Sequence, residues 1–594
     1  MNLITELKQR NVYRAATLYA ATGWLLVQIT TQVLPFFDVP NWVERIIVIA
    51  VFAGFPVAML LSWFYDWSAI APPVDETDTD ADAEAEPVEQ HSTRRKLDRW
   101  IIAALSLALI VLVVDQLFLN DDGTAQAGES IAVLPFSNAS DDKAEQYFSD
   151  GLSDDLISAL SQFSGLRVVS RNSSFQFRDS NEDSRSIAEK LGVKHLLDGT
   201  VRRAGTEVRI TAELINSADG STLWSQSYVR PYVDLFDLQA GITKAVAEQL
   251  KATLLADPES VRQSEHPPSG NLDAYNAYLQ GRFYEARGTE ADFRKAIEFY
   301  QRAASLDDRY ALAQARLSAM WTTLSGRFLE GVEMRRGYSM AREAVDRALS
   351  LDNDLAAAHV ARGMLMVWND FDWTGGEAEY HKALELLPND SAATALRANL
   401  LAALGRIDEA VEQIRLSLAT DALNAHSKHR LGVYLMAQGK LDESAQAFRD
   451  AIELQPDANG NYEQLTIVSV LRGDLEAAVE FAQQEPKGDW RDAAMARALQ
   501  IGDDRAAADA ALQLFIDKQA GKAAYQIAQV YALRGDGDQV FAWLARAWDS
   551  RDPGIGLLLY DPLLNAYRLD PRFAALCREV GLPKPAAALP LPSR

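Results

Sequence analysis

Cysteine is almost absent from this chain of 594 residues, because Cys577 is the only one. A single cysteine excludes an intrachain disulfide framework and any metal site built from Cys-x-x-Cys pairs. Cys577 follows Ala575 and Leu576 in a segment that we predict to be helical. We therefore interpret it as a packed thiol rather than a nucleophile.

The sequence also lacks the motifs of the common enzyme classes. It contains no G-x-x-x-x-G-K-[ST], G-x-G-x-x-G, H-E-x-x-H or G-x-S-x-G pattern. Asp150, Asp154 and Asp155 cluster near the start of a predicted helix, where carboxylates favour the positive end of the helix dipole. We interpret this cluster as helix capping, with ion binding as the alternative. We predict no catalytic residue, no cofactor site and no metal site, and we expect that the protein is not an enzyme.

Positive charge is too scarce for a nucleic-acid partner. The chain has 58 lysines and arginines against 83 aspartates and glutamates, which gives a net charge of −25. Binding to phosphates requires a basic face. The composition therefore argues against nucleic acid as a partner.

Long apolar runs are present near the start of the chain, and one of them covers residues 100–120. Residues 101–114 contain no charged residue, and a Leu-Phe-Leu triplet extends the run past Asp115. A bilayer core requires roughly 20 mostly apolar residues. Four basic residues precede the run, namely Arg94, Arg95, Lys96 and Arg99. We predict a transmembrane helix at 100–120, with a buried helix of a soluble domain as the alternative.

Two further apolar runs, 15–33 and 46–64, predict a transmembrane hairpin within the N-terminal segment 1–70. Basic residues before the first and third runs favour an N-terminus in the cytoplasm. We therefore expect a protein of the bacterial inner membrane with the bulk of the chain in the periplasm. Residues 71–99 are acidic and of low complexity, with a basic end, and we predict a disordered linker there.

Residues 130–250 show strand and helix patterns in alternation, which predict a compact α/β domain. Turn residues between the last three strands are typical of hairpins. Ser153 is interpreted as a helix N-cap. The expected elements are, in order, a strand at 130–136, a helix at 146–163, a strand at 166–170, a helix at 186–191, three strands within 193–229 and a helix at 236–250.

Five stretches of this region resemble a known family: SIAVLPFSN, YFSDGLSDDLISAL, GLRVVSRNSSFQF, LGVKHLLDGTVRR and RITAELINSADGSTLWSQSY. They are similar to the FlgO/TolB-N-terminal-like domain, which often stands before tetratricopeptide repeats in bacterial proteins. The resemblance implies a non-catalytic α/β module associated with the cell envelope. Related chains often have a winged-helix DNA-binding domain or a cyclase domain before the membrane helix, and here the predicted hairpin takes that place.

Residues 271–583 are helical and periodic. Gly405, Gly439 and Gly473 recur at intervals of 34 residues, which is the length of a tetratricopeptide repeat. Glycine closes the first helix of such a unit because it tolerates a left-handed backbone. The pattern resembles tetratricopeptide repeats and predicts an all-α superhelix of about seven units with a C-terminal cap. An irregular helical bundle is the alternative.

Small residues mark the places where paired helices of the repeats are expected to touch. Gly281, Gly363 and Gly432 are predicted at the close crossing on the first helix of their units. The unit near 311–351 is longer than the period, through an insertion around 325–337. After Gly473 the period becomes irregular.

Four polar residues of the repeats are candidates for contact with a partner: Asn399, His426, His429 and Arg430. His426 and His429 are three residues apart on a predicted helix, so they share a face. The resemblance to tetratricopeptide repeats implies a concave position for them. Contact with a peptide, a metal site and plain exposure to solvent are the alternatives, although no third metal ligand is evident. Ala395 stands where a carboxylate clamp has a basic residue, which puts that mode of recognition in doubt.

The predicted fold class is multidomain, with transmembrane helices, then a small α/β domain, then an all-α tetratricopeptide repeat superhelix. We expect a membrane-embedded scaffold whose periplasmic domains bind a protein or peptide partner in the repeat groove. One alternative is a signalling receptor that relays the periplasmic state to the cytoplasm. Another is an enzyme of the cyclase-associated family, for which no unassigned segment is large enough.

Overall fold

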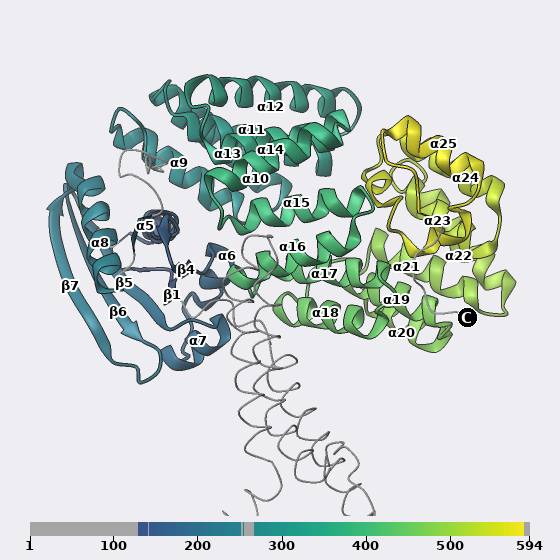
Figure 1. Ribbon diagram of the computed structural model, residues 1–594, viewed down its shortest axis with the longest axis horizontal. Helices are drawn as coiled ribbons and strands as arrows, with labels where there is room; N and C mark the ends of the chain where they lie inside the picture. The colour runs from purple at the N-terminus through teal and green to yellow at the C-terminus, as the bar shows by residue number, and fades with distance from the viewer. Residues whose placement is uncertain (1–128, 141, 251–252, 255–265, 587–594) are drawn as a thin grey trace, which may run out of the picture. The chain divides into compact units, whose positions relative to one another are not determined.

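The computed structural model describes residues 129–140, 142–250, 253–254 and 266–586 (Figure 1). These residues form a small mixed-sheet domain followed by an all-helical repeat region. No helix in these ranges is long and apolar enough to cross a membrane. The predicted fold class, which began with transmembrane helices, is therefore corrected to a mixed-sheet domain and a repeat region. The predicted membrane segments and the linker at 71–99 lie outside the described residues.

The sheet combines a parallel part with an antiparallel meander. Strand β1 runs parallel to both β4 and β5, and β5, β6 and β7 follow one another as antiparallel hairpins. The short strand β2 (Ser137–Asn138) also pairs with β5. The strand order is β4 (Leu166–Val168), β1 (Glu129–Val133), β5 (His195–Ala204), β6 (Glu207–Asn216) and β7 (Thr222–Pro231).

Helices cover one face of the sheet along its width and part of the opposite face. Helices α5 (Gln146–Leu160) and α8 (Leu235–Gln249) share a core with Ile131 and Val133, and α7 (Ser184–Leu191) packs on the opposite face. Successive side chains of a strand point to opposite faces, so one strand contributes to both cores.

Two details of this domain differ from the prediction. The first strand ends at Val133 rather than at residue 136, and the following Pro135 has no backbone N–H to donate to a sheet. Ser153 is not an N-cap, because it lies inside α5 and is buried. Its hydroxyl accepts a hydrogen bond from the backbone N–H of Phe136 at 2.8 Å, so it binds the chain just after the strand ends.

The repeat region consists of helix pairs, and in most pairs the first helix ends near a glycine. Gly405, Gly439 and Gly473 follow first helices and have φ between +74° and +77°, which confirms the predicted role of glycine there. The helices are α9 (Leu272–Glu285), α10 (Glu290–Leu306), α11 (Ala311–Phe328), α12 (Gly331–Leu351), α13 (Ala356–Leu365), α14 (Trp373–Leu386), α15 (Ser391–Ala403), α16 (Ile407–Thr420), α17 (Ala425–Ala437), α18 (Leu441–Leu454), α19 (Asn461–Arg472), α20 (Leu475–Gln484), α21 (Asp489–Ala498), α22 (Arg505–Gln519), α23 (Ala524–Arg534), α24 (Gly537–Asp549) and α25 (Pro571–Val580).

An aromatic ring of the second helix lies against a glycine of the first helix in several repeats. A Cβ atom on Gly281, Gly363 or Gly432 would lie 2.5–2.7 Å from the ring of Tyr300, Tyr380 or Phe448, respectively. The predicted close crossings are therefore confirmed. The longer unit predicted near 311–351 is also present, and its extra residues lengthen α11 and α12.

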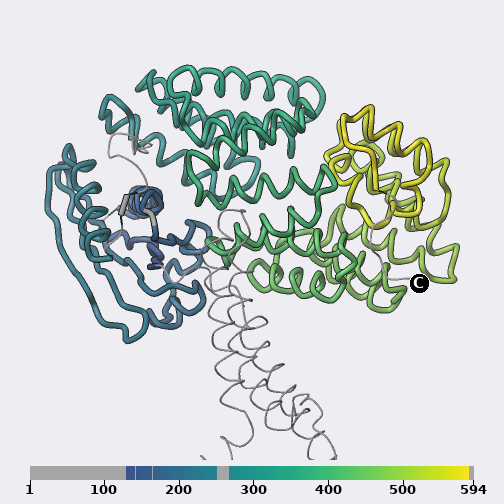
Figure 2. The backbone as a smooth tube through the Cα atoms, viewed as in Figure 1, coloured from purple at the N-terminus to yellow at the C-terminus, as the bar shows by residue number. Residues whose placement is uncertain are grey.

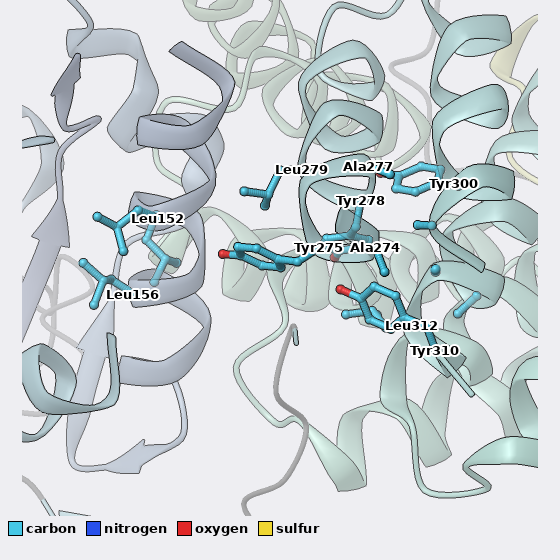
Figure 3. Close-up of a cluster of buried hydrophobic side chains, with 14 of the residues drawn as sticks. Leu152, Leu156, Ala274, Tyr275, Ala277, Tyr278, Leu279, Tyr300, Tyr310 and Leu312 are labelled. Carbon is cyan, nitrogen blue, oxygen red and sulfur yellow. The ribbon is translucent and has the colours of Figure 1, made fainter. Parts of the chain in front are cut away.

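The sheet domain and the first repeat share one hydrophobic core. Tyr275 and Leu279 point from α9 toward α5, and the Tyr275 hydroxyl donates a hydrogen bond to Asp155 there (Figure 3). A Cβ atom on Gly151 would lie 2.5 Å from Leu279, so the two helices approach closely. The repeats therefore begin on a surface that the sheet domain provides.

Candidate functional site

The inner surface of the later repeats is filled by a segment of the chain itself. This segment contains two short helices, η8 (Pro553–Leu557) and η9 (Pro562–Tyr567). Near its C-terminal end the chain turns back and packs on earlier repeats (Figure 2). Residues of η8 contact α15 and α23. A C-terminal cap was predicted for the repeats, and the structure places the beginning of this C-terminal part along the first helices of several repeats.

Apolar contacts anchor this self-bound segment, which we define as residues 552–568. The rings of Tyr434 on α17 and Tyr560 lie 5.9 Å apart in an edge-to-face arrangement. Leu559 lies against Gly405, and Leu563 joins a core with Leu465 of α19. The segment therefore occupies the surface where a peptide partner of tetratricopeptide repeats was expected.

A buried polar ladder runs beside the self-bound segment. Asp561 accepts hydrogen bonds from Gln529 at 2.6 Å and from the Tyr525 hydroxyl at 2.9 Å. Gln529 in turn accepts from Arg497, whose guanidinium pairs with Glu463 at 2.5 Å. Arg497 is 1% exposed, so this pair is fully buried. Burial raises the pKa of the Asp561 carboxyl.

Polar side chains of the first helices of the repeats take part in this ladder. Glu463, Arg497, Gln529 and Asp561 follow one another at intervals of 34, 32 and 32 residues. His429 stands 34 residues before Glu463, at the corresponding position of α17. These side chains bind neighbouring repeats and the self-bound segment.

The four residues predicted to contact a partner lie in two different environments. Asn399 accepts a hydrogen bond from the hydroxyl of Tyr434, beside the self-bound segment. His429 lies 2.8 Å from the Asn461 side chain, and its ring packs against Phe448 at 5.5 Å between centroids. Arg430 is half-buried near Tyr434 and Tyr560. A role for these residues in partner binding stays a prediction.

His426 differs from the other three because it lines an open cavity. Its side chain is accessible from the cavity, yet surrounding protein removes much of its bulk water. This desolvation, together with the charge of Arg430, lowers the pKa of His426 to about 3. The same two causes lower the pKa of His429 to about 4. Both rings are therefore neutral at pH 7. In the described ranges, no group of three His, Cys, Asp or Glu side chains is placed to hold a metal ion.

The cavity lies between the sheet domain and the repeats and has a volume of about 1150 Å³. One wall is formed by α5 and the short helix α6 (Arg171–Ser174). The other wall is formed by parts of α9 and α11 and by the starts of α13, α15 and α17. The described lining includes six arginines and four carboxylates, namely Arg171, Arg178, Arg282, Arg287, Arg316, Arg327, Asp150, Asp154, Glu285 and Asp390.

Ion pairs connect the two walls of the cavity. Asp154 of α5 pairs with Arg282 of α9 at 2.5 Å and with Arg171 at 3.6 Å. Arg178 pairs with Asp150 at 2.7 Å, within the sheet domain. The predicted aspartate cluster on α5 therefore forms ion pairs rather than capping the helix.

A second contact closes the cavity at the start of α17. Ser173 donates a hydrogen bond to Asp421 at 2.6 Å and accepts one from the backbone N–H of Leu423 at 2.9 Å. The backbone N–H of Ser170 donates to the carbonyl of Thr420 at 2.8 Å. The sequence analysis missed this contact. The run GLRVVSRNSSFQF contains its residues, but no periodic signal links them to residues about 250 positions later.

Comparisons with known proteins agree with the repeat assignment. Residues 425–458 match the tetratricopeptide repeat family, and residues 126–244 match a family described as HilA/YgeH-like transcriptional regulator, second domain. The chain therefore contains a segment similar to a tetratricopeptide repeat, and this segment follows the sheet domain. The match of the sheet domain does not test its predicted likeness to the FlgO/TolB-N-terminal-like domain.

One curated relative comes from Rhizobium meliloti (strain 1021) and is named "Putative adenylate cyclase 3". It is 36% identical over 199 residues, which are 33% of this chain and 33% of that protein. The chain therefore spans about a third of the length of the relative it matches.

Several solved structures are similar to parts of this chain. YrrB, a tetratricopeptide repeat protein with an unusual peptide-binding site, is 16% identical and covers 36% of this chain and 97% of its own, with a TM-score of 0.25. Pseudomonas aeruginosa PilF is 16% identical over 37% of this chain and 98% of its own, with a TM-score of 0.29. Yeast Tom70 is 15% identical over 52% of this chain and 67% of its own, with a TM-score of 0.33.

Proposed function

We propose that this protein is an interaction scaffold that holds a segment of a partner protein in the cavity between its sheet domain and its repeats. The observation that carries this proposal is the division of the repeat surface. The later repeats already hold the self-bound segment, whereas the earlier repeats border a cavity of about 1150 Å³. Stacked repeats provide extended concave surfaces of the kind that bind protein segments.

The sheet domain would act as the second wall of this binding site. It contributes α5 and α6 to the cavity and is joined to the repeats through a shared core and through Asp421. Its predicted likeness to the FlgO/TolB-N-terminal-like domain implies a non-catalytic module, which agrees with this role. A rigid second wall limits the loss of entropy on binding, because the site is formed before the partner arrives.

Two alternatives to the scaffold remain as hypotheses. A signalling receptor would require that partner binding changes an output in another compartment. A cyclase activity is suggested by the family resemblance and by the name of the relative, and detectable nucleotide turnover by the purified chain would support it. The periplasmic location of the bulk of the chain stays a prediction. Protease added to spheroplasts tests it, because a periplasmic bulk would be cleaved.

Site-specific photo-crosslinking in cells tests the proposed function. A photoreactive residue would replace Gln162 or Ala392 in the cavity wall, and Ser225 on the exposed side of β7 would serve as the control position. We expect adducts with one defined segment of one protein from both cavity positions. Adducts of equal yield from Ser225, or none from the cavity positions, would contradict the proposal.

A further inference from the structure

We infer that the segment held in this cavity is acidic and that Arg171, Arg282 and Arg316 recognise its carboxylates. This inference rests on the proposed function and names the chemistry of the partner. The three arginines come from α6, α9 and α11, so they meet only in the folded chain. Their guanidinium groups can bind carboxylates through two parallel hydrogen bonds.

The cavity is locally positive although the whole chain is strongly acidic. Its described lining includes six arginines and four carboxylates, whereas the chain has a net charge of −25. The cavity is therefore a place where an acidic segment meets an excess of positive charge. A basic segment would meet charges of its own sign in the same position.

Arg171 and Arg316 have hydrogen-bonding capacity that the described part of the chain does not use. The Nε atoms of Arg171 and Arg316 are buried and make no hydrogen bond in the described part of the chain. Their ion pairs with Asp154 and Glu285 are 3.6 Å long, which is longer than a hydrogen bond. The side chains of Arg171 and Arg316 are 19% and 29% exposed, so a carboxylate in the cavity can reach their guanidinium groups and offer a closer acceptor.

The two neighbouring carboxylates are already shared among several donors. Asp154 also pairs with Arg282 at 2.5 Å, and Glu285 also accepts a hydrogen bond from the Tyr300 hydroxyl. Arg171 and Arg316 therefore share acceptors that other donors already use. A carboxylate from the partner would supply a further acceptor.

The starts of three helices add to the positive potential of the wall. Ala356, Ser391 and Ala425 are the first residues of α13, α15 and α17, and all three line the cavity. The N-terminal end of a helix favours negative charge. This effect supports the arginines, which supply the specific contacts.

Other classes of ligand fit the cavity less well. An apolar segment would bury the guanidinium groups further and would offer them no additional acceptor. A nucleic acid would have to approach a protein of net charge −25. An acidic protein segment is the occupant that both observations favour.

A peptide-display experiment tests this inference with the full chain. Random short peptides would be selected separately against the wild type, Arg316→Gln, Arg316→Lys and the control Arg335→Gln, which alters an exposed arginine of α12 outside the cavity. Enriched peptides would then be measured by fluorescence anisotropy. Thermal unfolding of each variant would establish that it is folded.

We expect the wild type and Arg335→Gln to enrich peptides rich in aspartate and glutamate. Arg316→Gln should bind them about tenfold more weakly, and Arg316→Lys should lie between, because lysine keeps the charge but loses the planar fork. Enrichment of apolar or basic peptides would overturn the inference and leave the proposed function standing. Acidic peptides that bind Arg316→Gln as tightly as the wild type would also overturn it. Enrichment of no peptide would contradict the proposed function itself.

Discussion

Tyr434 and Tyr560 meet edge to face, with their ring centroids 5.9 Å apart, although 126 positions separate them in the chain. Tyr434 also donates a hydrogen bond to Asn399, so one aromatic side chain links two repeats to the self-bound segment. The repeat surface that sequence reasoning assigns to a partner is here in contact with the chain's own C-terminal part.

We predict that Tyr560→Ala loosens the self-bound segment. Removal of a buried aromatic side chain should lower the free energy of unfolding by about 3 kcal/mol. Hydrogen exchange at 553–567 should become faster, while exchange in β5 and β6 stays unchanged. Leu569→Ala serves as the control, because Leu569 is 78% exposed and should have little effect.

We predict that Gly432→Ala destabilises its repeat by about 1–3 kcal/mol, because overpacking a tight contact forces neighbouring atoms to move. The added Cβ would lie 2.7 Å from the ring of Phe448. The double variant with Phe448→Leu should recover part of the loss, as measured by urea unfolding. Gly241→Ala on α8 is the matched control, because nothing in the described residues lies within 4 Å of its new Cβ. A loss of equal size at both positions would refute this explanation.

We predict that Asp421→Ala weakens the contact between α6 and the start of α17. Asp421 is 1% exposed and accepts hydrogen bonds from Ser173 and Asn424, both at 2.6 Å. Leaving these donors unpaired should cost about 2 kcal/mol. Exchange of the amides at 170–177 should accelerate. Asp442→Ala, which removes an exposed carboxylate, should leave those amides unchanged, and acceleration by both variants would count against the contact.

Two histidines should give pH dependences of opposite sign. The pKa of His429 is lowered to about 4 by burial and by Arg430, so its contribution to stability is lost as the pH falls from about 6.5 to about 4. The pKa of His359 is raised by its hydrogen bond to Glu379, so its contribution is present below about 6.5 and is lost as the pH rises through the folded-state pKa.

Unfolding free energies measured across this pH range test both directions. His429→Gln should reduce the loss of stability in acid, and His359→Gln should reduce the loss at higher pH. The same slope for both variants would show that the two histidines do not titrate as described.

Much of the local structure follows from patterns within short stretches. The glycines at 34-residue intervals and the small residues at helix crossings predict the repeats, because they reflect backbone conformation and contact within one helix pair. The early end of β1 agrees with the properties of Pro135.

The cavity and the self-bound segment were not predictable in the same way. Ser173 meets Asp421 about 250 positions later, and Arg171 and Arg316 reach one cavity from separate domains. Contacts of this kind depend on tertiary packing and leave no periodic pattern. A local sign of the self-bound segment was its two Asp-Pro pairs, beginning at Asp552 and Asp561, each of which starts a short helix.

Hydrogen exchange of the full chain with and without an enriched acidic peptide tests the central claim most directly. With the peptide bound, we predict slower amide exchange at the cavity walls, around 171–178, 282–287 and 424–426. Exchange at 553–567 should not change. Protection at 553–567 or along β7, with none at the cavity walls, would contradict the central claim.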